Sequence, residues 1–252
     1  MVVARRGQRL VDHLKGTMSK VEELVKANPV RQVIECMASE VGVGLNHVVD
    51  AVKLAGMLHD IGKSLSAYQR RALEDERPSF RLHEVVSANI YAKACLIHAE
   101  SEGVYPHPYP WLAGLTLQSI ILHHQGLRTL TIESLFDRGL RRLVEDGLNE
   151  SMANIRQVVS ELKAGISHKP TLRLLEVVEE YAREVLEYNP QLVQQVFSLV
   201  EGPSKTYLAR IATACLMIAD CWDAYMATRD TTSRYIEDAV LRYLRTLNMR
   251  LG

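Results

Sequence analysis

Two adjacent pairs of polar residues end apolar segments in this sequence, at positions where they could act together on a metal ion. His59 and Asp60 directly follow the apolar segment 54–58, and His123 and His124 end a second apolar segment. An imidazole and a carboxylate at the end of a buried helix are costly to dehydrate, and a bound metal ion is the usual compensation. A solvated pair at a helix end would explain the His-Asp pair equally well, so the remaining candidates matter.

Three more residues of suitable chemistry lie in other apolar helices, namely His13, His83 and Asp220. His83 stands in the first turn of its expected helix, where the helix dipole favours a neutral imidazole ligand over a cation. A lone histidine such as His13 is usually a hydrogen-bonded core residue. Only the whole set of candidates indicates that His13 is a metal ligand. This number of nitrogen and oxygen ligands suffices for two metal ions about 3.5–4 Å apart, bridged by a carboxylate. Such a pair activates water and hydrolyses phosphodiesters.

Helices must position all of these residues, because apolar side chains recur at helical spacing along most of the chain. We expect helices over residues 8–26, 30–41, 45–61, 66–76, 81–102, 111–124, 171–188, 204–229 and 234–247, two short helices within 131–163, and one more that starts at Asn189 and Pro190. No segment alternates as a strand does and no linker is visible, so we expect one all-α domain over residues 1–252. Gly62 is expected to leave the 45–61 helix with positive φ.

The composition limits the classes of function that this chain can have. The 252 residues are 47% hydrophobic, and 30 Lys and Arg balance 30 Asp and Glu to a formal net charge of zero. A neutral chain is not a general polyanion binder, so contact with nucleic acid must use a local patch or a partner. No apolar run approaches the roughly 20 residues of a membrane span, and four cysteines without a CxxC pair predict reduced thiols in the cytoplasm. His47, His107 and His168 lie outside the candidate set, and we expect them at the surface.

The order of the candidates, H…HD…H…HH…D, resembles the pattern of the HD phosphohydrolase superfamily. His59 to Lys63, followed by Tyr68 and Gln69, resembles the HDxGK….FQ segment of CRISPR-associated HD nucleases. Residues 81–88, RLHEVVSA, are similar to the RxHExxSA segment of the same nucleases. The resemblance runs from residue 13 to residue 220 and implies an α-helical HD-domain bundle around a dinuclear metal site.

The resemblance also implies a division of the ligands. One metal ion would be held by His13, His59, Asp60 and Asp220, and the second by Asp60, His83, His123 and His124. Asp60 would then bridge both ions as a catalytic residue, and Lys63 would contact the scissile phosphate. The last aspartate is open at this stage, because Asp223 follows Asp220 by three residues on the same helix face and the expected Ala-Ser pair is absent; we favour Asp220.

The resemblance further implies the stand-alone nuclease subunit of type I CRISPR interference, which is found mainly in archaea. Such a subunit cleaves single-stranded DNA as an endonuclease or exonuclease, beside a separate helicase and a crRNA-guided effector complex. Two divalent ions are implied, and a histidine-rich site suits Mn, Fe, Co, Ni or Zn better than Mg, which also stays open. The alternatives are an HD-superfamily nucleotidase or cyclic-nucleotide phosphodiesterase, and a catalytically inactive helical adaptor, against which the full set of seven candidates argues.

Three arginines are candidates for contact with DNA, because they flank candidate ligands in sequence. Arg70 and Arg71 follow the His-Asp pair, and Arg81 precedes His83 by two residues. Phosphate contacts require cationic side chains near the scissile bond. A solvated helix face explains these arginines equally well.

Overall fold

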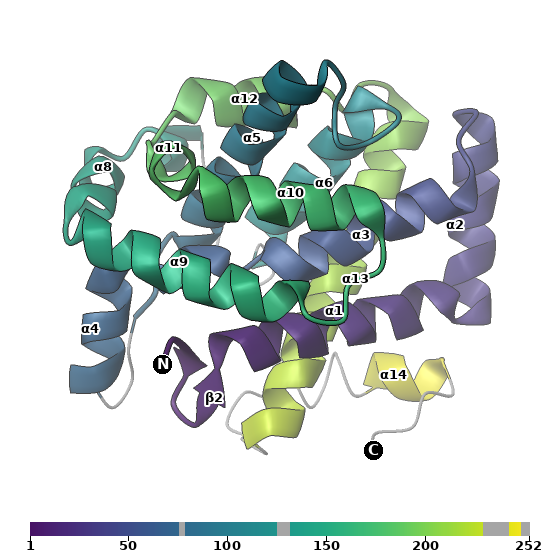
Figure 1. Cartoon of the computed structure of the whole chain (residues 1–252). Coiled ribbons are helices and arrows are strands. Elements are labelled where there is room, and N and C mark those ends of the chain that lie inside the picture. Colours follow the sequence, from purple (N-terminus) through teal and green to yellow (C-terminus); the bar gives the residue numbers. More distant parts are fainter. Residues whose placement is uncertain (76–78, 125–131, 229–241, 248–252) are drawn as a thin grey trace.

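The computed structural model describes residues 1–75, 79–124, 132–228 and 242–247. Within them the chain folds as the expected helical bundle (Figure 1). Its centre is built from α1 (Leu10–Lys26), α3 (Leu45–Leu58), α6 (Pro110–Leu122) and α13 (Pro203–Thr228), which pack on one another. The apolar stripes predicted from helical spacing meet there, so the centre contains many fully buried side chains.

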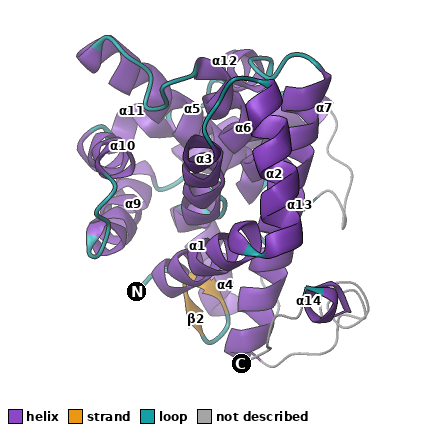
Figure 2. Ribbon diagram, turned by 90° about the vertical axis from the view of Figure 1, so that its right-hand side faces the viewer, coloured by secondary structure: helices purple, strands orange, loops and turns teal. Residues whose placement is uncertain are grey.

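The other helices surround this centre. They are α2 (Asn28–Glu40), the short 3-10 helix η1 (Ile61–Ser64), α4 (Ser66–Glu74), α5 (His83–Glu102), α7 (Ile132–Leu135), α8 (Arg138–Glu145), α9 (Leu148–Lys163), α10 (Lys169–Glu180), α11 (Ala182–Leu186), α12 (Pro190–Phe197) and α14 (Arg242–Thr246). The pair α9 and α10 lies on one side of α3, whereas α2 and α13 lie on the other (Figures 1 and 2). No single described helix is long and apolar enough to cross a membrane. Helix α2 and the segment Leu45–Ser64, which are bent by 116° at the break between them, reach the length and composition of a span only as a pair.

A small β-ribbon at the start of the chain was not predicted. Strands β1 (Val3–Arg5) and β2 (Gln8–Arg9) pair antiparallel around Gly7, whose φ is +80°. The ribbon takes the first residues of the predicted 8–26 helix, so α1 begins at Leu10. Strands this short carry no readable alternation, which is why the sequence does not indicate them.

The predicted 45–61 helix ends earlier than expected, and Gly62 has a different role. The α-helix stops at Leu58, and η1 follows the His-Asp pair. Gly62 does not adopt positive φ; instead a Cβ there would lie 2.4 Å from the carbonyl oxygen of His83 and 2.9 Å from the amide nitrogen of Ser87. The glycine is therefore required because η1 and α5 approach each other closely, not because the chain turns.

Three other expectations need correction. The predicted 171–188 helix is two helices, since the chain breaks at Tyr181 (φ −98°, ψ 38°) before α11 begins. His107 is buried rather than at the surface, because its loop folds back on α5 and its Nε2 lies 3.1 Å from the Tyr91 hydroxyl. Of the predicted 234–247 helix, α14 covers the last part, and residues 229–241 lie outside the described residues. His47 and His168 are exposed as expected.

Candidate metal centre

The structure brings all seven predicted ligands together, from five helices that are distant in sequence. They are His13 on α1, His59 and Asp60 after α3, His83 at the start of α5, His123 and His124 after α6, and Asp220 on α13. Six of them are buried and His124 is half-buried. The convergence follows from the packing of α1, α3, α6 and α13, because α3 and α6 end at the same place in the bundle.

The seven residues form two groups that share Asp60. His13, His59, Asp60 and Asp220 make one group, and Asp60, His83, His123 and His124 the other; within each group the ligand atoms all lie within 4.8 Å of one another. The two oxygens of Asp60 face different groups. Its Oδ2 lies 3.1 Å from His13 Nε2, whereas its Oδ1 lies 2.6 Å from His83 Nε2. This is the arrangement that a carboxylate bridging two cations requires.

Three of the histidines are oriented by the same local device. The Nδ1 atoms of His59, His83 and His123 hydrogen-bond to the carbonyl oxygens three residues earlier, at 2.9, 2.6 and 2.6 Å. Each ring therefore donates through Nδ1 and presents Nε2 to the cluster, which is how backbone carbonyls fix metal-binding histidines.

Buried polar atoms without partners mark the place for a cation. Within the described part of the chain, His59 Nε2 and His123 Nε2 are buried and have no hydrogen-bond partner. Buried nitrogens are almost always satisfied, so such atoms need an explanation. A metal ion held in each of the two groups would supply it, since His59 belongs to one group and His123 to the other. The donor set of five imidazoles and two carboxylates fits divalent transition metals.

Asp223, which the sequence left open as the last metal ligand, instead hydrogen-bonds to a ligand. Its Oδ2 lies 2.8 Å from Nδ1 of His13 and accepts a 2.7 Å hydrogen bond from Nε2 of Gln8. Asp220 belongs to the cluster, whereas Asp223 holds the opposite side of the His13 ring and so orients it. Gly16 makes this possible, because a Cβ there would lie 1.9 Å from Asp223 Oδ1.

The electrostatics of the cluster favour anionic carboxylates. Burial by itself would raise the pKa of Asp60, but the Lys63 ammonium together with His59 and His83 holds it well below its usual value. Burial would lower the pKa of His13, yet its hydrogen bonds with three carboxylates raise it to about 9. In the protein without bound cations, protons on imidazole therefore balance part of the carboxylate charge, which a metal ion would balance instead.

A family model described as the HD domain matches residues 12–160, which is more than half of the chain. The chain belongs to the HD-domain family. HD domains are metal-dependent hydrolases that bind divalent ions, and the two groups of ligands around Asp60 agree with this. Among solved structures, the chain is similar to the CRISPR-associated Cas3 HD domain protein MJ0384 from Methanocaldococcus jannaschii, with 20% identity, a TM-score of 0.43, and coverage of 87% of this chain and 98% of that one. No curated protein matches the sequence.

Lys63 of this HD domain lies directly beside the bridging candidate Asp60. Its Nζ is 2.5 Å from Asp60 Oδ2, its side chain is 9% exposed, and the ammonium lies 5.3 Å from the centre of the Phe80 ring. An ammonium held there is well placed to meet an oxygen of a bound phosphate, as the resemblance implies.

The three arginines predicted to contact DNA are not gathered at the centre. Arg70 forms ion pairs with Asp146 at 2.5 Å and Glu150 at 3.5 Å, on the surface where α4 meets α9. Arg71 and Arg81 are exposed, and among the described residues no side-chain contact connects either of them to the seven ligands. The observations therefore favour a solvated face for Arg70 and leave DNA contact by Arg71 and Arg81 a prediction.

Another arginine, which sequence reasoning missed, does reach the centre. Arg5 ends strand β1, and its Nη2 lies 3.6 Å from Asp220 Oδ1 and 3.4 Å from each ring nitrogen of His13. The sequence offers no signal for this contact, since the basic N-terminal stretch also contains Arg6 and Arg9. Only the pairing of β1 with β2 shows which of the three turns inward.

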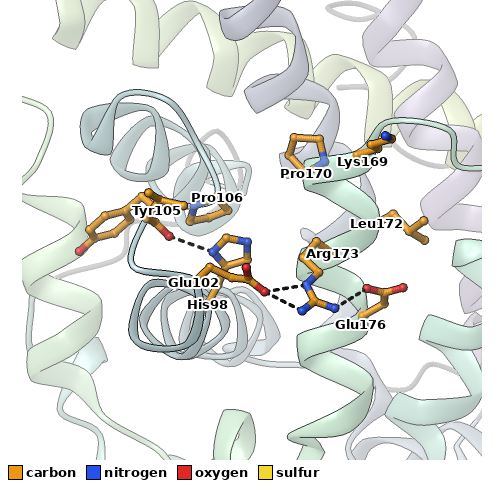
Figure 3. A pocket seen from close by; sticks show the side chains of 10 residues that line it. His98, Glu102, Tyr105, Pro106, Lys169, Pro170, Leu172, Arg173 and Glu176 are labelled. Carbon is orange, nitrogen blue, oxygen red and sulfur yellow. Dashed lines mark hydrogen bonds and ion pairs between the residues drawn. The ribbon is translucent and has the colours of Figure 1, made fainter.

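A separate surface pocket of about 470 Å³ lies between the end of α5 and the start of α10 (Figure 3). Arg173 joins Glu102 and Glu176 on its wall, at 2.6 and 3.2 Å. The pocket contains none of the seven ligands, and three of its charged side chains, Glu102, Arg173 and Glu176, pair with one another. The chemistry of this HD domain is therefore assigned to the buried cluster and not to this surface pocket.

Proposed function

We propose that this HD domain is a metal-dependent nuclease that cleaves single-stranded DNA in CRISPR defence. It would act beside a separate helicase and a crRNA-guided effector complex, which deliver the displaced strand. The observation that carries the proposal is the division of Asp60 between two ligand groups, because a phosphodiester is hydrolysed most directly by two ions that share a carboxylate. Bound there, the ions would supply a water of lowered pKa and stabilise the leaving oxygen.

The residues that set the nuclease-like motifs apart from a bare HD pattern all support this centre. Gly62 allows η1 to touch α5, and its amide donates a 2.9 Å hydrogen bond to Ser87 Oγ, which joins the HDxGK and RxHExxSA segments. Gln69 Nε2 donates a 2.6 Å bond to the carbonyl of Lys63 and so fixes the chain beside the ammonium. These residues belong to the nuclease-like motifs and not to the bare H…HD…D pattern, which also fits nucleotidases, and for this reason we favour the nuclease.

The choice of a single strand rests on access. Six of the seven ligands are buried at the place where several helix ends meet, so a scissile phosphate must enter a recess. A flexible strand can do this, whereas a duplex about 20 Å across must first be opened, as enzymes that modify bases in DNA also require. The zero net charge of the chain implies weak unaided affinity for DNA, which is the reason to expect delivery by partners.

The test compares labelled single-stranded DNA, intact duplex and free nucleotides with protein loaded with Mn²⁺, Ni²⁺, Co²⁺, Fe²⁺, Zn²⁺ or Mg²⁺. We expect cleavage of the single strand, little cleavage of duplex and loss of activity in EDTA. Transition metals should restore the activity better than Ca²⁺, which binds imidazole poorly. Rapid dephosphorylation of nucleotides together with inert single-stranded DNA would replace the nuclease with a nucleotide or cyclic-nucleotide phosphohydrolase.

A further inference from the structure

The N-terminal ribbon is fixed to the segment that follows Lys63. The backbone nitrogen of Val3 donates a 2.9 Å hydrogen bond to Gln69 Oε1, and Gln69 Nε2 donates a 3.0 Å bond back to the Val3 carbonyl. This paired amide contact is the one that an adjacent strand would make. At the same end of the ribbon, the backbone nitrogen of Leu10 donates a 2.9 Å hydrogen bond to the carbonyl of Val2, so the start of α1 closes the ribbon. The first strand is therefore held in one position beside the metal centre.

The strand places one guanidinium at the centre and keeps its neighbours away from it. The side chain of Arg5 is 28% exposed and lies over His13 and Asp220, at the edge of the cluster. Arg6 is exposed, and Arg9 pairs with Glu161 away from the cluster. The pairing of β1 with β2 therefore selects Arg5 from three nearby arginines.

The Arg5 guanidinium has hydrogen-bond donors that the protein does not fully use. Its distance of 3.6 Å to Asp220 Oδ1 is longer than a normal charged hydrogen bond, and within the described part of the chain its buried Nε has no hydrogen-bond partner. A guanidinium has five donors in a rigid fork that matches the oxygens of a phosphate. Two divalent ions would outweigh the charges of Asp60 and Asp220, and Arg5 and Lys63 add to that excess, so the site requires an anion.

We propose that Arg5 binds a non-bridging oxygen of the substrate phosphate at the metal centre, and that Gln69 positions Arg5 through strand β1. The proposal deepens the phosphodiester function above and rests on it. It gives the N-terminal ribbon a part in substrate binding. It also gives the Tyr-Gln motif a purpose, since Gln69 ties together the two segments that carry Arg5 and Lys63.

The experiment measures the binding of inorganic phosphate to Mn²⁺-loaded protein by calorimetry, with the metal content of each sample determined in parallel. Arg5→Ala should keep the metal content of the wild type and weaken phosphate binding about ten- to hundredfold, the range of a lost charged hydrogen bond. Arg5→Lys should recover only part of that loss, because an ammonium lacks the planar fork. Arg6→Ala removes the same charge from an exposed position and should change neither quantity.

Two results would contradict the proposed role of Arg5. An Arg5→Ala protein that loses metal would show that Arg5 only supports Asp220, and one that keeps its affinity for phosphate would remove Arg5 from substrate binding. Neither result depends on DNA cleavage, whereas failure of the nuclease proposal would appear as wild-type protein inert toward single-stranded DNA.

The positioning role of Gln69 is tested by a double-mutant cycle. Gln69→Ala should weaken phosphate binding in the wild-type background and have little further effect in Arg5→Ala, because both changes remove the same contact. Fully additive losses would show that Gln69 acts through its other bond, to the Lys63 carbonyl, and would overturn this part of the proposal.

Discussion

At the scale of single residues, the centre depends on how each ring and carboxylate is held as much as on which residues are present. The Nδ1 atom of His13 faces Asp223, whereas His59, His83 and His123 use backbone carbonyls. A sequence shows the histidines but not which nitrogen is held. In these four histidines the hydrogen bond at Nδ1 turns Nε2 toward the cluster. These bonds therefore determine which nitrogen can bind a cation.

Asp60→Ala should abolish binding of both metal ions, because both ligand groups use this carboxylate. We expect activity to fall at least about a hundredfold, since even the loss of an outer-sphere partner costs about 10–100-fold. Metal analysis of the purified variant and its circular dichroism check the prediction, and the helical signal should persist. His47→Ala and His168→Ala are matched controls, because both residues are exposed. An Asp60→Ala protein with full metal content and rate would exclude the bridging role.

At the scale of elements, close approach between helices positions the ligands. The 3-10 helix η1 packs against the start of α5, and the amide of Gly62 bonds to Ser87 there. This contact brings Asp60, just before η1, to within 2.6 Å of His83 Nε2. The distance from Asp60 to His83 therefore depends on a close backbone contact at Gly62, where a side chain would clash.

Gly62→Ala should damage the centre although it replaces none of the seven ligands. The added Cβ would meet the His83 carbonyl at 2.4 Å, and backbone cannot yield as a flexible side chain does. We expect a loss of stability of about 1–3 kcal/mol and weaker metal binding, measured by denaturant unfolding and metal titration. Gly44→Ala is the control, since its Cβ would find only ordinary contact at 3.8 Å. Equal behaviour of the two variants would contradict the close-approach argument.

At the scale of the whole molecule, the bundle buries polar groups outside the centre as well. His107 lies on a loop that reaches back to α5 and α6, where its Nε2 meets the Tyr91 hydroxyl at 3.1 Å and the Thr116 hydroxyl at 3.5 Å. Burial, together with the smaller effects of the nearby His168, His47 and His98, lowers the pKa of His107 to about 4. The folded protein therefore favours the neutral form of the His107 imidazole.

The free energy of unfolding should therefore decrease in mild acid, because His107 takes up a proton when the protein unfolds. Between the ordinary pKa of 6.5 and the folded value of about 4, the unfolded chain binds a proton on this ring and the folded chain does not. Stability is unaffected by this group above pH 6.5 and decreases as the pH falls to 4, by up to about 3 kcal/mol. His107→Gln should lose this part of the pH dependence in denaturant unfolding, whereas His47→Gln, at an exposed position, should retain it. Parallel pH profiles of wild type and His107→Gln would refute the prediction.

The sequence by itself determined the helical class, most of the helices and the seven candidate ligands that meet at the centre. Apolar spacing indicates the buried helix faces, and His59-Asp60 and His123-His124 stand at the ends of two such helices, so their convergence follows once those helices pack. The tertiary structure alone decided the roles of Asp223, Arg5, Gly62 and His107. Each of these roles is a contact between segments distant in sequence, as between His13 and Asp223. Local periodicity carries no information about such contacts, because it reports which face of an element is buried and not what lies against that face.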